Sequence, residues 1–214
     1  MSVAKTVFVV DDDPSVRKSL ARLLTSTGHR VDTFASAGDF LRRKPRPPGA
    51  ACMILDLRMP EVDGLELHTL LREANSTLPV VFATGHGEVP DSVRAMKLGA
   101  VDFLTKPVDE TQLLTAVERA LALDEARTRA ETARVTLAKR QGRLTPRERQ
   151  VFSLVVTGML NKQIAGRLGA SERTIKAHRA RVMQKMQADS VAALVRMADR
   201  LDTAAPRGSL ASLT

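Results

Sequence analysis

The chain has 214 residues, a formal net charge of +9 and a single cysteine, Cys52. This length allows one or two domains with a hydrophobic core, and one cysteine excludes a disulfide framework or a thiolate metal cluster. The longest apolar runs fall far short of the roughly 18 residues of a transmembrane helix. The N-terminus does not resemble a signal peptide, because its short apolar run ends in acidic residues. These features favour a protein of the reducing cytosol.

The charge is distributed unevenly along the chain. Residues 1–122 contain 15 lysines and arginines against 16 aspartates and glutamates, whereas residues 123–214 contain 18 against 8, a net charge of +10. A nearly neutral first part and a basic second part predict two modules, the second of which faces a polyanion. A solvated charged surface is the alternative interpretation of the basic part.

The first part alternates short apolar β-rich runs with helical patterns. Five strands alternating with five helices predict a doubly wound (βα)5 fold with a parallel five-stranded sheet. The continuously apolar runs suit strands that are covered on both faces. The expected strands are Thr6–Val10, Val31–Phe34, Ala51–Leu55, Val80–Phe82 and Val101–Leu104; the expected helices run from Pro14 to about Gly28, over Ala37–Arg43 and Leu65–Arg72, from Pro90 to about Gly99, and from Asp109.

Polar residues follow four of the expected strands, at the point where each strand ends. Asp11 and Asp12 follow the first strand, Asp56 the third, Thr84 the fourth and Lys106 the fifth. Because ligands of open α/β sheets bind at the carboxyl ends of the strands, these side chains are expected at one rim. Carboxylates crowded together there repel one another unless a hard dication that prefers oxygen ligands, such as Mg²⁺, lies between them.

This set also suits phosphoryl transfer. Asp56 can act as a nucleophile and form an aspartyl-phosphate. Mg²⁺, the Lys106 ammonium and the Thr84 hydroxyl would each stabilise one oxygen of the transferred group. Simpler explanations exist for each group alone, since residues 11–13 can cap a helix and Thr84 can belong to a turn. The agreement of four strand ends favours the joint site.

These residues carry a resemblance to a known family. The acid pair Asp11-Asp12, the stretch LDLRMPEVDG around Asp56, TGHG at Thr84 and KP at Lys106 occur in the order and spacing of a receiver domain of two-component response regulators. The resemblance extends from residue 5 to about residue 122. Residues 1–122 are therefore expected to form a receiver, or phosphoacceptor, domain.

The resemblance implies that a histidine kinase phosphorylates Asp56 in a Mg²⁺-dependent reaction, with Mn²⁺ as a substitute ion. Asp12 would bind the ion directly, Asp11 through water, and Asp56 and the backbone carbonyl of Arg58 would complete the protein ligands. Asp13 lies one place beyond the acid pair and is expected at the start of the next helix, where a negative charge is favourable.

The resemblance also makes Phe103 a switch aromatic, which turns inward when Thr84 moves toward the phosphoryl group. A core position on the last strand is the alternative, because alternation along a short strand permits either facing. His86 is a lone turn histidine, and it is expected at the surface without a catalytic role.

Residues 123–142 are expected to form a helical linker. The segment has no proline, its only glycine is Gly142, and alanine and arginine dominate it. Glu125 and Arg129 lie four residues apart, and Glu131 and Arg134 three apart, which supports an exposed helix. A disordered linker is the alternative, because isolated helices are marginally stable in water.

Residues 143–202 are predicted to form a four-helix domain. The first helix starts with a capping box formed by Thr145 and Glu148, with Pro146 at the first position. The following helices are expected from Asn161 to Gly169, after Ser171 and from Ser190. Two short helices joined by a glycine-containing turn, the second of them basic, indicate a helix-turn-helix motif.

In the third helix of this domain, Ile175, Val182 and Met186 form the expected buried stripe. Its polar and basic side chains then project elsewhere, and a DNA major groove admits such a helix. Binding of RNA or single strands is disfavoured, because it relies on stacked aromatic residues and this part has only Phe152. The expected DNA-binding residues are Arg173, Thr174, Lys176, Arg179 and Arg181.

The stretches LTPRERQV, NKQIA, SERTIKAHRARVMQKM and LVRMA resemble the LuxR-type four-helix DNA-binding domain. Together with TGHGEVP, they make the chain most similar to the FixJ-type subgroup of the NarL/FixJ regulators. The resemblance implies a bacterial cytoplasmic regulator that dimerises on phosphorylation and binds double-stranded promoter DNA. RNA polymerase is a further implied partner, no membrane is implied, and the only catalysis is its own aspartyl phosphorylation and dephosphorylation. The small, polar segment 203–214 is expected to be disordered.

Two other functions stay open. A metal-dependent phosphohydrolase would use the same acids, but the sequence offers no second acid–base group near Asp56, and a DNA-binding module is unexpected in such an enzyme. A regulator that acts by protein contacts alone would not require the full set of acids, threonine and lysine.

Overall fold

The computed structural model describes residues 5–43, 48–85 and 89–202, and the chain divides into two compact units after Arg129. The expectations for His86 and for residues 203–214 lie outside these ranges. Among the described residues, no helix has both the length and the apolar character needed to span a bilayer.

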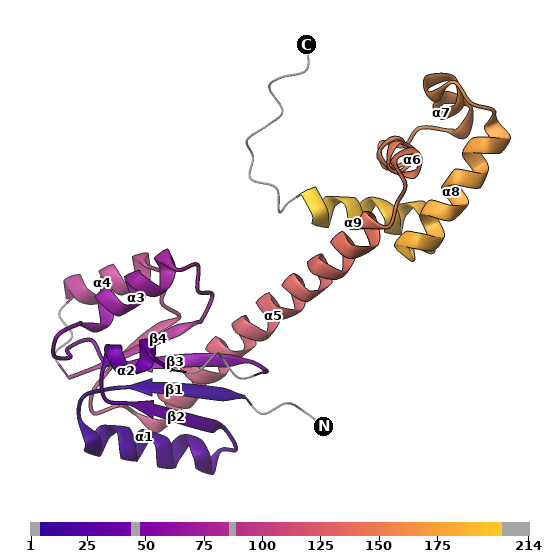
Figure 1. Cartoon of the computed structure of the whole chain (residues 1–214). Helices are drawn as coiled ribbons and strands as arrows, with labels where there is room; N and C mark the ends of the chain where they lie inside the picture. Colours follow the sequence, from indigo (N-terminus) through magenta and orange to yellow (C-terminus); the bar gives the residue numbers. More distant parts are fainter. Residues whose placement is uncertain (1–4, 44–47, 86–88, 203–214) are drawn as a thin grey trace. The chain divides into compact units, whose positions relative to one another are not determined.

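The first unit contains a parallel five-stranded sheet with helices on both faces (Figure 1). Its strand order is β2-β1-β3-β4-β5, and every neighbouring pair is parallel. This confirms the doubly wound fold, and the strand ends lie within two residues of those expected. The strands are β1 (Thr6–Val10), β2 (Arg30–Phe34), β3 (Ala51–Leu55), β4 (Val80–Thr84) and β5 (Asp102–Thr105).

Two hydrophobic clusters, one on each face, hold the helices against the sheet. Alternate residues of β1 point to opposite faces. Val7 and Val9 pack with α1 and α5, whereas Phe8 and Val10 pack with α2, α3 and α4. Burial on both faces explains why β1, β3 and β4 are apolar along their length. The helices are α1 (Pro14–Ser26), α2 (Ala37–Leu41), α3 (Gly64–Glu73), α4 (Val89–Lys97) and α5 (Glu110–Gly142).

Residues of α5 that follow the expected boundary at residue 122 still contact the strands and loops of the first unit. The buried Asp124 carboxylate accepts a hydrogen bond of 2.9 Å from the amide of Ala51, at the start of β3. The Arg127 guanidinium donates to the carbonyl of Thr77 at 3.0 Å. Residues 123–142 are helical within α5, and the pairs Glu125–Arg129 (3.1 Å) and Glu131–Arg134 (2.6 Å) are formed.

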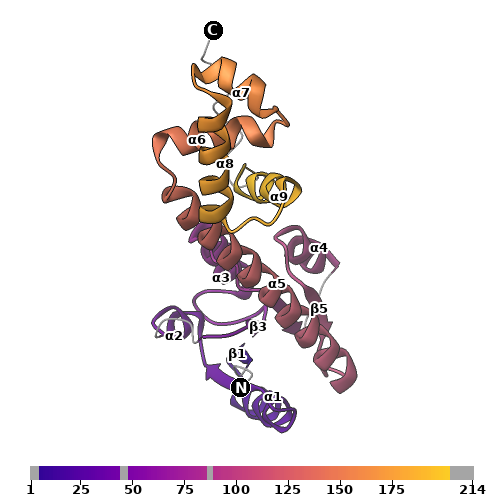
Figure 2. The ribbon, with the colours of Figure 1, turned by 90° about the vertical axis from the view of Figure 1, so that its right-hand side faces the viewer.

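The second unit contains the end of α5 and four further helices, α6 (Pro146–Val156), α7 (Asn161–Leu168), α8 (Glu172–Met186) and α9 (Val191–Asp202). Helix α8 packs against α6 and α7, and Figure 2 shows this unit from a second direction. The expected stripe Ile175, Val182 and Met186 is completely buried, and Phe152 joins the same core. The helix starts are also as expected, since Thr145 and Ser171 cap α6 and α8.

An ion pair joins the buried Glu148 to the partly exposed Lys185 at the edge of the core of the second unit. The Glu148 carboxylate accepts hydrogen bonds from the Lys185 ammonium at 2.6 Å and from the amide of Thr145 at 2.8 Å. The Lys185 hydrogen bond, followed by the Thr145 amide, lowers the pKa of Glu148 from 4.5 to about 2. The ionised carboxylate therefore stabilises the folded unit, because protonation would remove its charge from these donors.

This pair should make the stability of the second unit depend on pH. The folded pKa of Glu148 lies below the unfolded value, so the contribution is complete above about pH 4.5 and is lost as the pH falls toward 2. We expect Glu148→Gln to lower the free energy of unfolding at pH 7 by at most about 3 kcal/mol, and much less near pH 2. Calorimetric unfolding of the full chain across this range measures the difference. The matched variant Glu131→Gln changes an exposed glutamate and should have a much smaller effect; an equal loss from Glu148→Gln at pH 7 and pH 2 would contradict the account.

Candidate functional site

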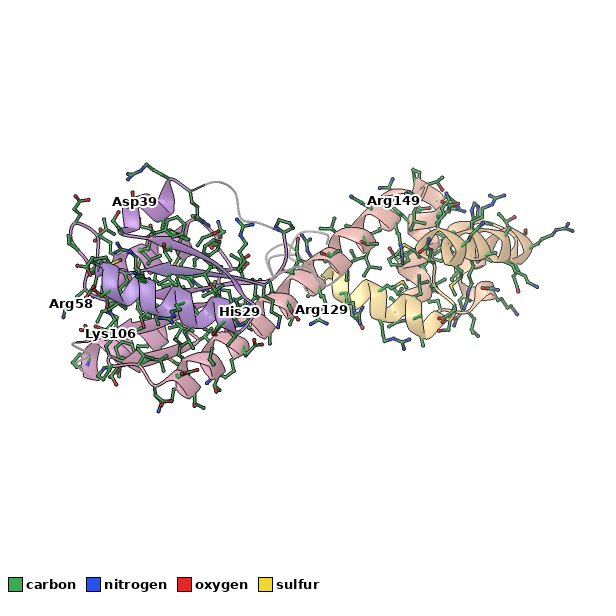
Figure 3. All side chains as sticks on the ribbon, turned by 90° about the horizontal axis from the view of Figure 1, so that it is seen from below. His29, Asp39, Arg58, Lys106, Arg129 and Arg149 are labelled. Atoms are coloured by element: carbon green, nitrogen blue, oxygen red, sulfur yellow. The ribbon has the colours of Figure 1, made fainter. Side chains whose placement is uncertain are left out.

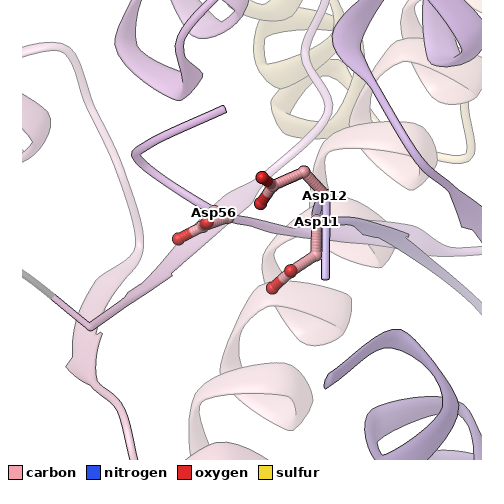
Figure 4. A group of neighbouring side chains, drawn as sticks. All are labelled: Asp11, Asp12 and Asp56. Atoms are coloured by element: carbon pink, nitrogen blue, oxygen red, sulfur yellow. The ribbon is translucent and has the colours of Figure 1, made fainter. Parts of the chain in front are cut away.

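The carboxyl edge of the sheet brings three aspartates together (Figure 4). Asp11 and Asp12 follow β1 and Asp56 follows β3. One carboxylate oxygen from each lies within 4.8 Å of the other two. Asp11 and Asp56 are buried, with exposures of 2% and 6%, whereas Asp12 is exposed. The cluster therefore has two acids below the surface and one at its mouth.

Lys106, which follows β5, bridges the two buried acids. Its ammonium lies 2.7 Å from Asp11 Oδ2 and 3.3 Å from Asp56 Oδ1. Burial raises the pKa of Asp56, Lys106 opposes this rise, and the negative charge of Asp11 adds to it. Burial alone would lower the pKa of Lys106, but its hydrogen bond to Asp11 and the charges of both acids raise it overall. Lys106 is thus held in its charged form, which reduces the repulsion between the carboxylates.

The three aspartates in the loop between β1 and α1 have different contacts. Asp13 is the N-cap of α1 and accepts the amide of Ser15 at 2.7 Å, which lowers the pKa of its carboxyl. Asp11 Oδ1 accepts the amide of Asp13 at 2.9 Å, and the Arg17 guanidinium donates to the Asp11 carbonyl at 2.6 Å. Asp13 therefore serves the helix, as expected from the sequence, while the acid pair belongs to the cluster.

Gly64 allows α3 to start directly against the phosphoacceptor candidate. A Cβ atom at this position would overlap the carbonyl oxygen of Asp56. The Gly64 amide donates to the Leu57 carbonyl at 2.9 Å, and Asp56 Oδ1 accepts the Leu57 amide at 2.9 Å. Gly64 is the last residue of the stretch LDLRMPEVDG, and its role is not visible in the sequence because the close approach to Asp56 depends on the fold.

The ends of β4 and β5 supply the remaining expected residues. Thr84 is buried at the end of β4, and its carbonyl accepts the Lys106 amide at 2.8 Å, which aligns the two strand ends. Phe103 on β5 is half-buried, with its ring centre 6.4 Å from that of Phe82. Phe103 therefore packs only partly into the core. Its role as a switch residue stays a prediction.

Arg58 lies two residues after Asp56, and Figure 3 shows it at the same end of the first unit as Lys106. Its exposed guanidinium lies 3.1 Å from the carboxylate of Asp91, in the first turn of α4. The expected role of Arg58 concerns its backbone carbonyl, and it stays a prediction.

The cluster fits a hard dication. Its three donors are carboxylate oxygens, which Mg²⁺ prefers, and one of them, that of Asp12, belongs to an exposed residue. The rim therefore holds a carboxylate that can act as a nucleophile, oxygen ligands for a metal ion and the Lys106 ammonium. Phosphoryl transfer requires groups of these kinds.

Four of the five expected DNA-binding residues lie on the exposed surface of α8. Arg173, Lys176 and Arg181 are exposed, and the exposed Thr174 pairs its hydroxyl with that of Ser171 at 2.8 Å. The fifth, Arg179, differs from this group. It is half-buried, and its guanidinium donates to Asn161 Oδ1 on α7 at 2.9 Å. Arg179 is therefore already paired within the unit, and the DNA contact expected of it stays a prediction.

A parallel sheet with this acid cluster and lysine, followed by a four-helix unit with a basic third helix, defines the class of receiver-containing DNA-binding regulators. Residues 7–118 match the family model described as "Response regulator receiver domain", and residues 142–198 match "Bacterial regulatory proteins, luxR family". The chain belongs to the two-component response regulators with a LuxR-type DNA-binding domain, of the NarL/FixJ kind.

Curated relatives and solved structures agree with this assignment. Nodulation protein W of Bradyrhizobium diazoefficiens is 44% identical over 204 residues, which cover 95% of this chain and 89% of that protein. Transcriptional regulatory protein FixJ of Azorhizobium caulinodans is 46% identical over 192 residues, 90% of each chain. The structure of the response regulator StyR matches with a TM-score of 0.83 at 45% identity, covering 92% of this chain and 100% of that one. Full-length FixJ from B. japonicum matches with a TM-score of 0.57 at 41% identity, covering 95% and 99%.

Proposed function

We propose that this protein is a phosphorylation-controlled transcription regulator of the cytoplasm. Asp56 accepts a phosphoryl group from a sensor histidine kinase, and the phosphorylated chain dimerises and binds specific promoter DNA, where it contacts RNA polymerase. The observation that carries the proposal is the Lys106 bridge between the buried Asp11 and Asp56, beside the exposed Asp12. Phosphoryl transfer to itself and the later loss of that group are its only chemistry.

The transfer follows from the chemistry of these side chains. A carboxylate oxygen of Asp56 attacks phosphorus, and the new O–P bond forms as the P–N bond to the kinase histidine breaks. The bonding electron pair leaves on the imidazole nitrogen. Asp11, Asp12, Asp56 and the Arg58 carbonyl would hold Mg²⁺, which supplies neutralisation of charge on a phosphoryl oxygen. Lys106 neutralises a second oxygen, and the Thr84 hydroxyl donates to a third.

Phosphorylation is coupled to the surface of α4 and β5. Thr84 moves toward the phosphoryl group, and Phe103 turns inward into the space beside it. Two apolar side chains on α4, Val93 and Met96, are 46% and 49% exposed, which supports a dimer contact on this face. Arg94 and Lys97 on the same helix provide its polar margin.

Dimerisation gives the DNA-binding unit its affinity. A single small module covers too little DNA for tight specific binding, whereas a dimer places two α8 helices in two half-sites. The exposed polar and basic residues of α8 and the charge of +10 over residues 123–214 support double-stranded DNA as the partner.

Sedimentation velocity of the full chain tests this proposal. We expect the mass to increase on addition of acetyl phosphate and Mg²⁺, and to stay at its starting value with EDTA or without the donor. Met96→Glu places a charge in the proposed contact, so it should block the increase while phosphorylation persists, and the matched variant Leu123→Glu on α5 should not. The same mass with and without phosphorylation, on and off DNA, would reject the proposal.

A further inference from the structure

We propose that Arg179 is a positioning residue: its bond to Asn161 holds the recognition helix α8 against α7, and the choice among DNA sequences depends on that bond. This inference rests on the proposed function, in which α8 enters the major groove. It concerns how the helix is oriented, and it assigns to Arg179 a role other than the direct DNA contact expected from the sequence.

The bond joins two helices of the helix-turn-helix motif. Arg179 lies two turns into α8, and Asn161 is the first residue of α7. Both side chains are half-buried, and the guanidinium nitrogen lies 2.9 Å from Asn161 Oδ1. By contrast, Lys176 and Arg181 on the same helix are exposed. The polar and basic side chains of α8 are therefore divided between the interior of the motif and its surface.

Helix α7 is held at both ends by arginines from its neighbours. At its last turn, the Arg147 guanidinium of α6 donates to the Leu168 carbonyl at 2.5 Å. At its first residue, Arg179 of α8 binds Asn161. The N-cap position is Leu160, whose side chain has no oxygen to accept the free amides of the first turn. Within α7, the Leu160 amide donates to Gln163 Oε1 at 2.8 Å. The bond from Arg179 adds a contact to the first residue of α7 from outside the helix.

The chemistry of the Arg179–Asn161 bond favours a bond that stays formed when the protein binds DNA. Its acceptor is a neutral amide, so the positive charge of Arg179 still contributes to the field that attracts DNA. A guanidinium donor makes the hydrogen bond stronger than a neutral one. If Arg179 turned away toward a phosphate, the half-buried Asn161 oxygen would lose its partner at a cost in free energy. Base reading requires side chains held to within about 0.5 Å, which a fixed α7–α8 angle provides.

A double-mutant cycle on phosphorylated full-length protein tests the inference. The probes are a duplex that the wild-type protein selects from a random library and a shuffled duplex of the same composition. We expect Asn161→Ala and Arg179→Ala each to lower affinity for the selected duplex by about tenfold, with a much smaller loss on the shuffled one. The double variant should lose no more than Arg179→Ala alone, because both substitutions remove the same bond.

Two controls separate positioning from stability and from direct contact. Asn161→Asp retains an acceptor oxygen and should keep the ratio of affinities for the selected and shuffled duplexes, even if its charge weakens binding to both. Arg181→Ala combined with Asn161→Ala should give additive losses. Thermal unfolding of each variant fixes a temperature at which all are folded, and a role in stability alone would leave the affinity ratio unchanged there.

The overturning result is clear. If Arg179→Ala lowers the salt slope by about one unit while Asn161→Ala leaves the affinity ratio unchanged, then Arg179 contacts DNA directly. Loss of the ratio in Asn161→Asp would also contradict the inference. Should Arg179→Ala fail to fold, the two Asn161 variants decide the matter alone. If the wild-type protein selects no sequence, the proposed DNA binding itself fails, and this outcome is distinct from a failed cycle.

Discussion

Replacement of Asp56 by asparagine should abolish phosphorylation by acetyl phosphate in the presence of Mg²⁺. The amide has nearly the same shape and keeps an oxygen for the Leu57 amide, but it lacks the nucleophilic carboxylate. Intact-mass spectrometry should show one added phosphoryl group on the wild-type chain and none on Asp56→Asn. Asp12→Ala should also reduce the labelled fraction, because the metal site loses a carboxylate.

The chain offers a matched control for this substitution next to the site. Asp13 lies beside the acid pair but caps α1, and asparagine is an equally good N-cap. Asp13→Asn should therefore leave the labelled fraction close to that of the wild-type protein. Undiminished labelling of Asp56→Asn would show that another residue accepts the phosphoryl group.

On the DNA side, Lys176→Ala and Arg181→Ala should have different effects, although both remove one exposed positive charge from α8. Lys176 lies about one turn after the Ser171 N-cap, so it can reach a base edge, and its loss should cost about 1–3 kcal/mol of sequence discrimination. Arg181 is expected to contact a phosphate, so its loss should weaken binding to all sequences alike and lower the salt slope by about one unit. The two assignments can be exchanged without changing the binding mode.

Binding of each variant to the selected and shuffled duplexes across a salt series measures both effects. Arg129→Ala is a control with the same change in charge, because this residue lies on α5 and pairs with Glu125. If neither α8 substitution changes affinity for either duplex while the protein stays folded, α8 is not the reading element.

Local patterns were sufficient to predict the sheet, the strand ends and the helix caps. Ala51–Leu55 is apolar along its length because both faces are covered, and such a run can be recognised without the fold. Thr145 and Ser171 act within three residues of their own position, so their roles were also visible. The parallel topology alone was sufficient to predict that the polar residues at the strand ends lie at one edge of the sheet.

Contacts between distant residues could not be predicted in this way. Arg179 and Asn161 meet only because α7 and α8 pack at particular positions, and their separation in the sequence does not predict contact. The contacts of Asp124 and Arg127, which lie just beyond residue 122, could not be predicted for a related reason. A continuous helical pattern does not reveal where a helix leaves the sheet that it covers.

Footprinting on genomic DNA, with and without a phosphodonor, tests most directly whether phosphorylation of Asp56 controls specific DNA binding. The account predicts discrete protected sites for the wild-type protein with acetyl phosphate and Mg²⁺, spanning two half-sites, and weak or absent protection without the donor. Asp56→Asn should show the weak pattern under both conditions. Equal protection of the same sites by Asp56→Asn and by the phosphorylated wild-type protein would contradict the account.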